Sequence, residues 1–125
     1  MMTVGLRCHV PSRAGLDAYQ SLVRSCGAGN VWIVADEVTA APAAWSTGNV
    51  ARVTRGLLAR NGLRGDLPES GWRCGDYAHL ALFEASLAPR CWLVEPDVAF
   101  SRIDAKEFMH RFEDSVARWK AHPVA

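Results

Sequence analysis

Short apolar runs alternate with segments of helical periodicity along this chain, and that alternation limits the folds open to it. An unbroken apolar run such as residues 31–35 (Val-Trp-Ile-Val-Ala) is typical of a strand covered on both faces. Between these runs, apolar residues recur every three or four positions, as they do in amphipathic helices. Strands that alternate with helices predict an α/β fold: a mostly parallel sheet with flanking helices.

Turn-forming and capping residues set the limits of the predicted elements. Pro11, Gly27 and Pro89 each end a regular segment, and Asp76 is placed to cap a helix. Segment 38–48 is rich in Ala, Pro, Thr and Gly, and segment 62–71 holds three Gly and one Pro, so both are predicted to be loops. The predicted strands are 4–10, 31–35, 49–54 and 91–94, and the predicted helices are 14–26, 55–61, 76–88 and 105–120.

Size and charge exclude several classes of protein. A chain of 125 residues, 50% of them hydrophobic, fits one packed domain over residues 1–125. Its formal net charge of +1 provides no general field for nucleic acid or an anionic membrane. No apolar run approaches the ~18–20 residues of a membrane span, and the N-terminus does not resemble a signal peptide, so we expect a cytoplasmic protein.

The four cysteines do not indicate a zinc or redox site. They lie at positions 8, 26, 74 and 91, and no two form a Cys-x-x-Cys pair. We expect buried, reduced thiols that pack as small hydrophobic side chains.

Two carboxylates directly follow the last predicted strand, in the sequence Glu95-Pro96-Asp97. Proline favours an extended residue before it, and in an extended chain residues i and i+2 point to the same side. Both carboxylates could then hold a divalent cation, Mg²⁺ or Mn²⁺, that in turn holds a diphosphate. The alternative is that they are ordinary turn residues, solvated or paired with Arg90 or Arg102.

The stretch from Trp92 to Phe100, Trp-Leu-Val-Glu-Pro-Asp-Val-Ala-Phe, resembles the motif Y-W-R-V-E-P-D-V-K-F of fungal α-1,2-mannosyltransferases. The similarity extends weakly to Ile103-Asp104 and Phe108-Met109. Those enzymes have the GT-A fold, so the resemblance implies a Rossmann-like nucleotide-sugar-binding half. It also implies a glycosyltransferase that takes a nucleoside-diphosphate sugar as donor and a hydroxyl group as acceptor. Glu95 and Asp97 would then be the residues that bind Mn²⁺ or Mg²⁺ and the diphosphate.

Positions in that fold suggest further donor-binding residues. The first strand and its turn, the end of the second strand and the segment before strand 91–94 face the nucleotide sugar in GT-A enzymes. By this correspondence the nucleotide-sugar-binding residues would be His9, Arg13, Asp36, Arg73 and Asp76.

The chain departs from the family in ways that leave part of the function open. Leu93 and Ala99 replace an Arg and a Lys of the motif, so the donor sugar and acceptor are not specified. The chain has about half the length of a GT-A catalytic domain, as expected of a fragment or of a reduced relative. No catalytic base is identified, and inversion or retention cannot be read from the sequence.

A non-catalytic α/β module that binds a nucleotide or a protein is the alternative. The last predicted helix carries Phe108, Met109, Phe112, Val116 and Trp119 on one stripe. That stripe either packs on the sheet or forms a face for a partner, such as a second copy of this chain. The sequence has no Gly-x-Gly-x-x-Gly, Walker or Gly-x-Ser-x-Gly motif for the common dinucleotide, P-loop or hydrolase sites.

Overall fold

The computed structural model describes residues 2–8, 10–38, 41–45, 48–66, 75–98 and 104–121, the last seven of these as backbone alone. Every predicted strand and helix is present, with ends shifted by a few residues at most. A short 3-10 helix, Ala28–Asn30, is the one described element that the sequence did not predict. The elements in chain order are β1 Thr3–Cys8, α1 Arg13–Cys26, β2 Val31–Asp36, β3 Val50–Val53, α2 Arg55–Arg60, α4 Gly75–Ser86, β4 Cys91–Val94 and α5 Ala105–Ala121.

The four strands form one parallel sheet in the order β3-β2-β1-β4, which confirms the predicted α/β, Rossmann-like fold. Residues that are paired across neighbouring strands form the hydrophobic core of the sheet. Leu6 of β1 lies opposite Ile33 of β2 on one side and Val94 of β4 on the other. All three are buried, and they face α1.

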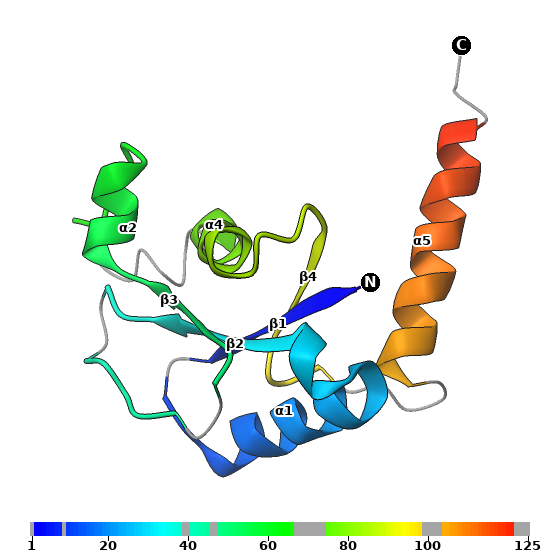
Figure 1. The fold of residues 1–125 in the computed structure, drawn as a ribbon, viewed down its shortest axis with the longest axis horizontal. Helices are drawn as coiled ribbons and strands as arrows, with labels where there is room; N and C mark the ends of the chain where they lie inside the picture. The colour runs from blue at the N-terminus through cyan, green and yellow to red at the C-terminus, as the bar shows by residue number, and fades with distance from the viewer. Residues whose placement is uncertain are drawn as a thin grey trace.

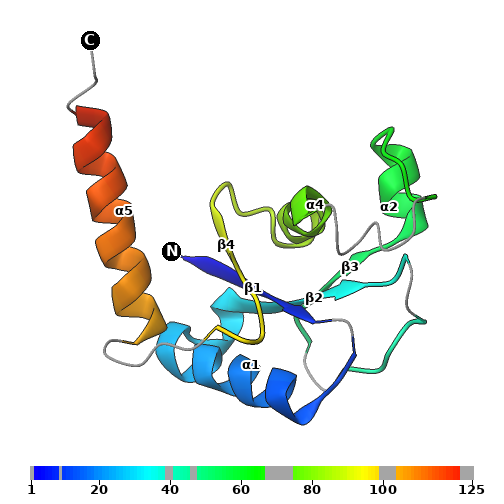
Figure 2. The same ribbon diagram turned by 180° about the vertical axis from the view of Figure 1, so that it is seen from behind.

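Helices cover both faces of the sheet (Figures 1 and 2). Helix α1 lies on one face, and the start of α5 packs beside its end. Helix α4 lies on the other face. The described part of the connection between β2 and β3 contains no helix. Trp45 of that connection packs instead on the core cluster beneath α1. A loop therefore covers the part of the sheet that a crossover helix usually covers.

Gly5 of β1 determines how closely α4 can approach the sheet. A Cβ atom at this position would lie 2.7 Å from Cδ2 of Leu82 in α4 and 2.8 Å from Cγ2 of Val34 in β2. Both distances are shorter than real Cβ contacts, so the close packing of α4 requires glycine here.

The structure corrects one predicted detail of the helices and bears on an alternative that the sequence left open for another. Helix α4 begins at Gly75, so Asp76 lies in its first turn and does not cap it. On α5, Met109 is fully buried whereas Phe108 and Phe112 are 42% and 52% exposed, so the described part of the apolar stripe packs on the sheet only in part. Both phenylalanines nevertheless contact the ring of Trp92 edge-on, at centroid distances of 6.2 and 5.2 Å. Among the described residues, no helix has the length and hydropathy to cross a membrane.

Candidate functional site

The strand order creates a switch point between β1 and β4. The connection from β1 to β2 passes over the face covered by α1, and the connection from β3 to β4 includes α4 on the opposite face. Neighbouring strands whose connections leave on opposite faces open a crevice at their carboxyl ends, where α/β proteins commonly bind ligands. Cys8 ends β1 and Glu95 directly follows β4, so both residues lie at this crevice.

An ion pair spans the switch point. Nη1 of Arg7 in β1 donates a hydrogen bond of 3.2 Å to Oε1 of Glu95. The Arg7 side chain is 9% exposed and that of Glu95 is 38% exposed. A guanidinium this deeply buried requires a counter-ion, because desolvation of an unpaired charge is costly. Glu95 therefore pairs with Arg7, and not with Arg90, which was one partner that the sequence alternative named. Arg102, the other, lies outside the described residues.

Sequence reasoning missed Arg7. The sequence did contain a sign of it: Arg7 is a charged residue inside an apolar strand. Because side chains alternate between the two faces of a strand, Arg7 lies on the face that α4 covers. A charged residue in a strand covered on both faces predicts a buried partner or a ligand, and that partner was not identified before the structure.

Cys8 lies next to this pair, on the side of β1 that faces α1. Burial raises the pKa of its thiol, and the negative charge of Glu95 raises this pKa further. The thiol therefore stays protonated and is a poor nucleophile or metal ligand. Its Sγ would lie 3.0 Å from a Cβ at Gly15, so the first turn of α1 packs closely on the end of β1. The cysteines that the structure describes, at positions 8, 26 and 91, are free thiols. Only Cys8 is buried as predicted, because Cys26 at the end of α1 and Cys91 at the start of β4 are partly exposed.

The chain turns between Glu95 and Val98 and does not continue extended. The amide of Val98 donates to the carbonyl of Glu95 at 3.1 Å, as in a β-turn with Pro96 at its favoured second position. Glu95 is partly buried and Asp97 is exposed on the turn. Proline extends only the residue before it, so it does not prevent the turn that follows. The predicted alignment of the two carboxylates through an extended backbone is therefore wrong: Glu95 and Asp97 are the first and third residues of one tight turn.

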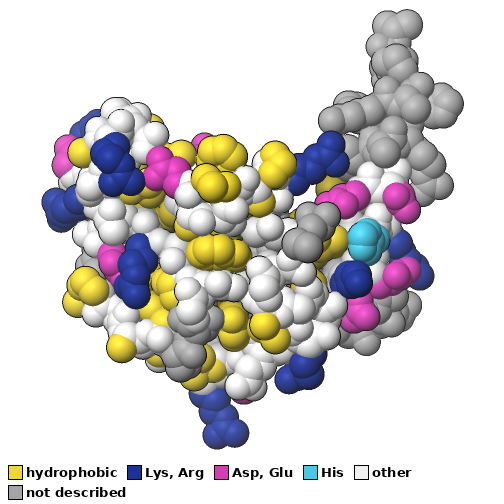
Figure 3. Space-filling model, in the orientation of Figure 1, with side chains coloured by type: hydrophobic (Ala, Val, Ile, Leu, Met, Phe, Trp, Pro, Cys, Tyr) yellow, Lys and Arg dark blue, Asp and Glu magenta, His cyan; other side chains and the backbone are white. Residues whose placement is uncertain are grey.

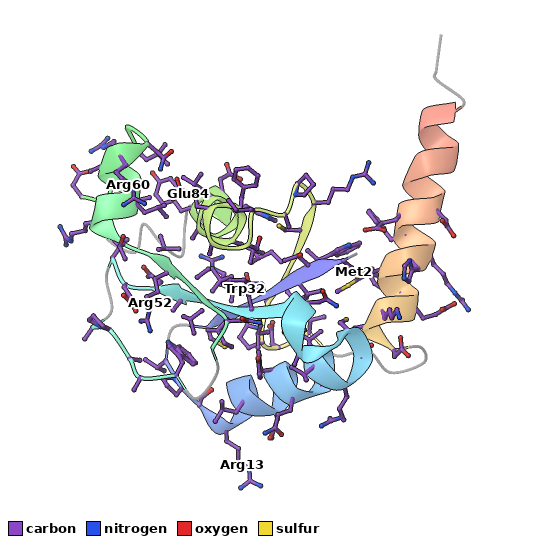
Figure 4. The ribbon with its side chains drawn as sticks, viewed as in Figure 1. Met2, Arg13, Trp32, Arg52, Arg60 and Glu84 are labelled. Atoms are coloured by element: carbon purple, nitrogen blue, oxygen red, sulfur yellow. The ribbon has the colours of Figure 1, made fainter. Side chains whose placement is uncertain are left out.

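Other predicted site residues lie near the carboxyl edge without converging on Glu95. Asp36 ends β2, is 5% exposed, and accepts a hydrogen bond of 2.9 Å from the amide of Val38. Arg13 begins α1 and points away from the molecule into solvent (Figure 4). Asp76 is exposed in the first turn of α4. His9 and Arg73 lie outside the described residues.

The described carboxylates do not form a metal site by themselves. No three His, Cys, Asp or Glu side chains within the described ranges are grouped so that they could hold a metal ion. Glu95 and Asp97 supply hard oxygen ligands, and Mg²⁺ is often held by one or two carboxylates together with substrate phosphates and water. The donor set therefore fits a cation that binds with a diphosphate, and does not fit a cation that binds alone.

The described cavities lie elsewhere. One of about 330 Å³ lies at the amino edge of the sheet, lined by Met2 and Arg90, which precede β1 and β4. An open groove of about 300 Å³ runs beside β3 between α2 and α4. In this groove Arg60 and Glu84 point toward one another and form an ion pair at 3.1 Å (Figure 4).

Comparisons of this chain with protein-family models, with curated proteins and with solved structures find no match.

Proposed function

We propose that this chain binds a nucleoside-diphosphate sugar at the carboxyl edge of its sheet, as the donor-binding half of a glycosyltransferase of the GT-A type. The observation that supports this most is that Glu95 and Asp97 follow β4 at the switch point of a parallel sheet. The resemblance of the Trp92–Phe100 motif to fungal α-1,2-mannosyltransferases adds the substrate class.

In this proposal Glu95 and Asp97 hold Mg²⁺ or Mn²⁺ together with the diphosphate. The cation would neutralise the charge that develops on the leaving diphosphate when the sugar moves to a hydroxyl acceptor. Arg7 keeps a positive charge within 3.2 Å of Glu95 and holds this carboxylate at the end of β4. That guanidinium also adds to the positive potential that an incoming diphosphate would meet.

The alternative is a non-catalytic module in which Glu95 serves only as the counter-ion of Arg7. The ion pair itself favours this alternative, because it satisfies both charges without a ligand. The exposed Phe108 and Phe112 on α5 favour a protein partner in that case, and a second copy of this chain is one candidate. The two proposals differ in whether a nucleotide and a metal bind together.

Thermal unfolding with UDP, GDP and their sugars, each with and without Mn²⁺ or Mg²⁺, tests the proposal. A ligand at ~100 times its dissociation constant adds about 2.7 kcal/mol, which raises Tm by several degrees for a chain of this size. We expect one nucleotide to give this shift with metal, and metal alone to give none. Asp97→Asn should abolish the shift without lowering the Tm of the free protein, since Asp97 is exposed.

Asp114→Asn is the matched control, because Asp114 is an exposed carboxylate on α5, outside the switch point. It should keep the full nucleotide shift. No shift with any nucleotide, in a protein that unfolds cooperatively, would contradict the donor-site proposal and favour the non-catalytic module. Turnover of the sugar nucleotide that binds would then separate an enzyme from a binding protein.

A further inference from the structure

The cavity at the amino edge of the sheet lies between the start of β4, the end of α1 and the first turns of α5. Met2, which lines it, lies beside α5, whereas Arg13 at the opposite end of the sheet lies far from it (Figure 4). Its volume of about 330 Å³ falls at the lower end of the range for small-molecule sites. The cavity is therefore separate from the carboxyl edge and independent of the function proposed there.

Basic side chains from two parts of the chain line this cavity. Lys106 and His110 stand four residues apart on α5 and so share one face of the helix, and Arg90 reaches the cavity from the segment just before β4. Neither Arg90 nor Lys106 forms an ion pair with a carboxylate of the described residues. Figure 3 shows charged side chains gathered along α5 on the face in view.

The one acidic residue of the lining, Glu113, is already engaged. Its Oε1 accepts a hydrogen bond of 3.1 Å from Nε1 of Trp92. The lining therefore carries two permanent positive charges and a histidine against one carboxylate. Burial raises the pKa of the Cys26 thiol, and the carboxylate of Asp104 lies near enough to raise this pKa further. A bound anion would balance the excess of positive charge in the lining.

An apolar wall completes the cavity. The ring of Trp92 lines it together with Met2 and Cys26. Trp92 is held in place by its hydrogen bond to Glu113 and by edge-on contacts with Phe108 and Phe112. Because this ring is already fixed, a ligand that packs on it loses little free energy in ordering the site.

We infer that this cavity binds a small organic anion, with a phosphate or carboxylate group between Arg90 and Lys106 and an apolar portion against Trp92. Guanidinium and ammonium groups form charge-assisted hydrogen bonds with either anion. An aromatic surface beside two cations selects an anion that also carries a ring or an aliphatic chain, because inorganic phosphate alone would leave the apolar wall in contact with water.

Isothermal titration of the full chain with phenyl phosphate, with benzoate and with inorganic phosphate tests this inference. We expect saturable binding of at least one of the two ring-bearing anions, several-fold tighter than that of inorganic phosphate. Comparison of phenyl phosphate with benzoate identifies which anionic group the site prefers. Arg90→Ala and Lys106→Ala should each weaken binding about tenfold, the loss of one charge-assisted hydrogen bond. Both side chains are exposed, so the variants should unfold at the Tm of the wild type.

Arg111→Ala is the matched control, since it removes the same charge from the same helix at a residue outside the cavity lining. The Arg111→Ala variant should bind the ring-bearing anion with an affinity within twofold of the wild type. In the wild type, the bound anion should shift the indole NMR resonance of Trp92. Three results would overturn the inference: no saturable binding at ~10 mM of either ring-bearing anion, equal affinity for inorganic phosphate, or an equal loss in Arg111→Ala. None of these readouts depends on nucleotide binding at the carboxyl edge.

Discussion

Breaking the Arg7–Glu95 ion pair tests the carboxyl edge most directly. Two unit charges 3.2 Å apart attract by about 5 kcal/mol at an effective dielectric constant of 20 and by ~1.3 kcal/mol in water. Arg7 is nearly buried whereas Glu95 is 38% exposed, so the environment lies between these limits, and the desolvation of Arg7 offsets part of the attraction. We therefore expect Glu95→Gln to lower the free energy of unfolding by about 1–3 kcal/mol.

A double-mutant cycle measured by urea unfolding at pH 7 isolates the pair. Its four proteins are the wild type, Glu95→Gln, Arg7→Met and the double variant. The double variant should recover most of the stability, because replacing a buried ion pair with apolar groups is often nearly neutral whereas removing one partner is not. We expect a coupling free energy of at least about 1 kcal/mol.

The exposed pair between Arg60 and Glu84 supplies the matched control. Nη2 of Arg60 lies 3.1 Å from Oε2 of Glu84, the carboxylate is 37% exposed, and the arginine is 64% exposed where Arg7 is nearly buried. Glu84 also accepts a long hydrogen bond of 3.4 Å from Asn61, which the glutamine of Glu84→Gln can still accept. Glu84→Gln should therefore cost at most about 1 kcal/mol. A coupling free energy below about 0.5 kcal/mol for Arg7–Glu95, or one equal to that of the exposed pair, would refute the reasoning that burial of Arg7 determines the strength of this interaction.

Two further predictions concern packing and titration. Gly5→Ala should destabilise the chain by about 1–3 kcal/mol in the same urea assay, because its Cβ has no room beneath α4. Gly56→Ala in α2, where the nearest atoms are 3.8 Å away, should be neutral or stabilising by up to about 1 kcal/mol, and equal effects at both glycines would exclude overpacking as the cause. Because the folded chain holds the Cys8 proton more tightly than the unfolded chain does, stability should fall as pH rises above the ordinary thiol pKa of 9.0. Cys8→Ala should reduce this slope by up to about 1.4 kcal/mol per pH unit, and an unchanged slope would contradict the raised pKa.

The succession of elements could be predicted from the sequence because each strand and helix has its own local signal. The apolar run of β2 is one such signal. The structure shows two more that the sequence prediction did not use, the N-cap residues of α1 and α2. Ser12 and Thr54 each accept a hydrogen bond from a backbone amide in the first turn of their helix. Such interactions join residues that are only three positions apart, so both partners can be recognised in a short stretch of sequence.

The candidate site could be predicted only in part. Glu95 and Asp97 could be singled out because they stand two positions apart in the sequence and directly follow a strand. Arg7 was not found, since its partner lies 88 positions away and the contact exists only once β1 and β4 pair in register. The cavity at the amino edge of the sheet could not be predicted for the same reason: Arg90 and Lys106 belong to different parts of the chain, and each resembles a solvated surface residue in the sequence.

By itself, then, the sequence determined which segments become strands and helices, because hydrophobic periodicity and capping act over a few neighbouring residues. Only the tertiary structure decided the strand order β3-β2-β1-β4, the approach of α4 onto Gly5, and the pairing of a buried arginine with Glu95. These features depend on how distant segments exclude water and satisfy buried charge together, and no local pattern carries that information.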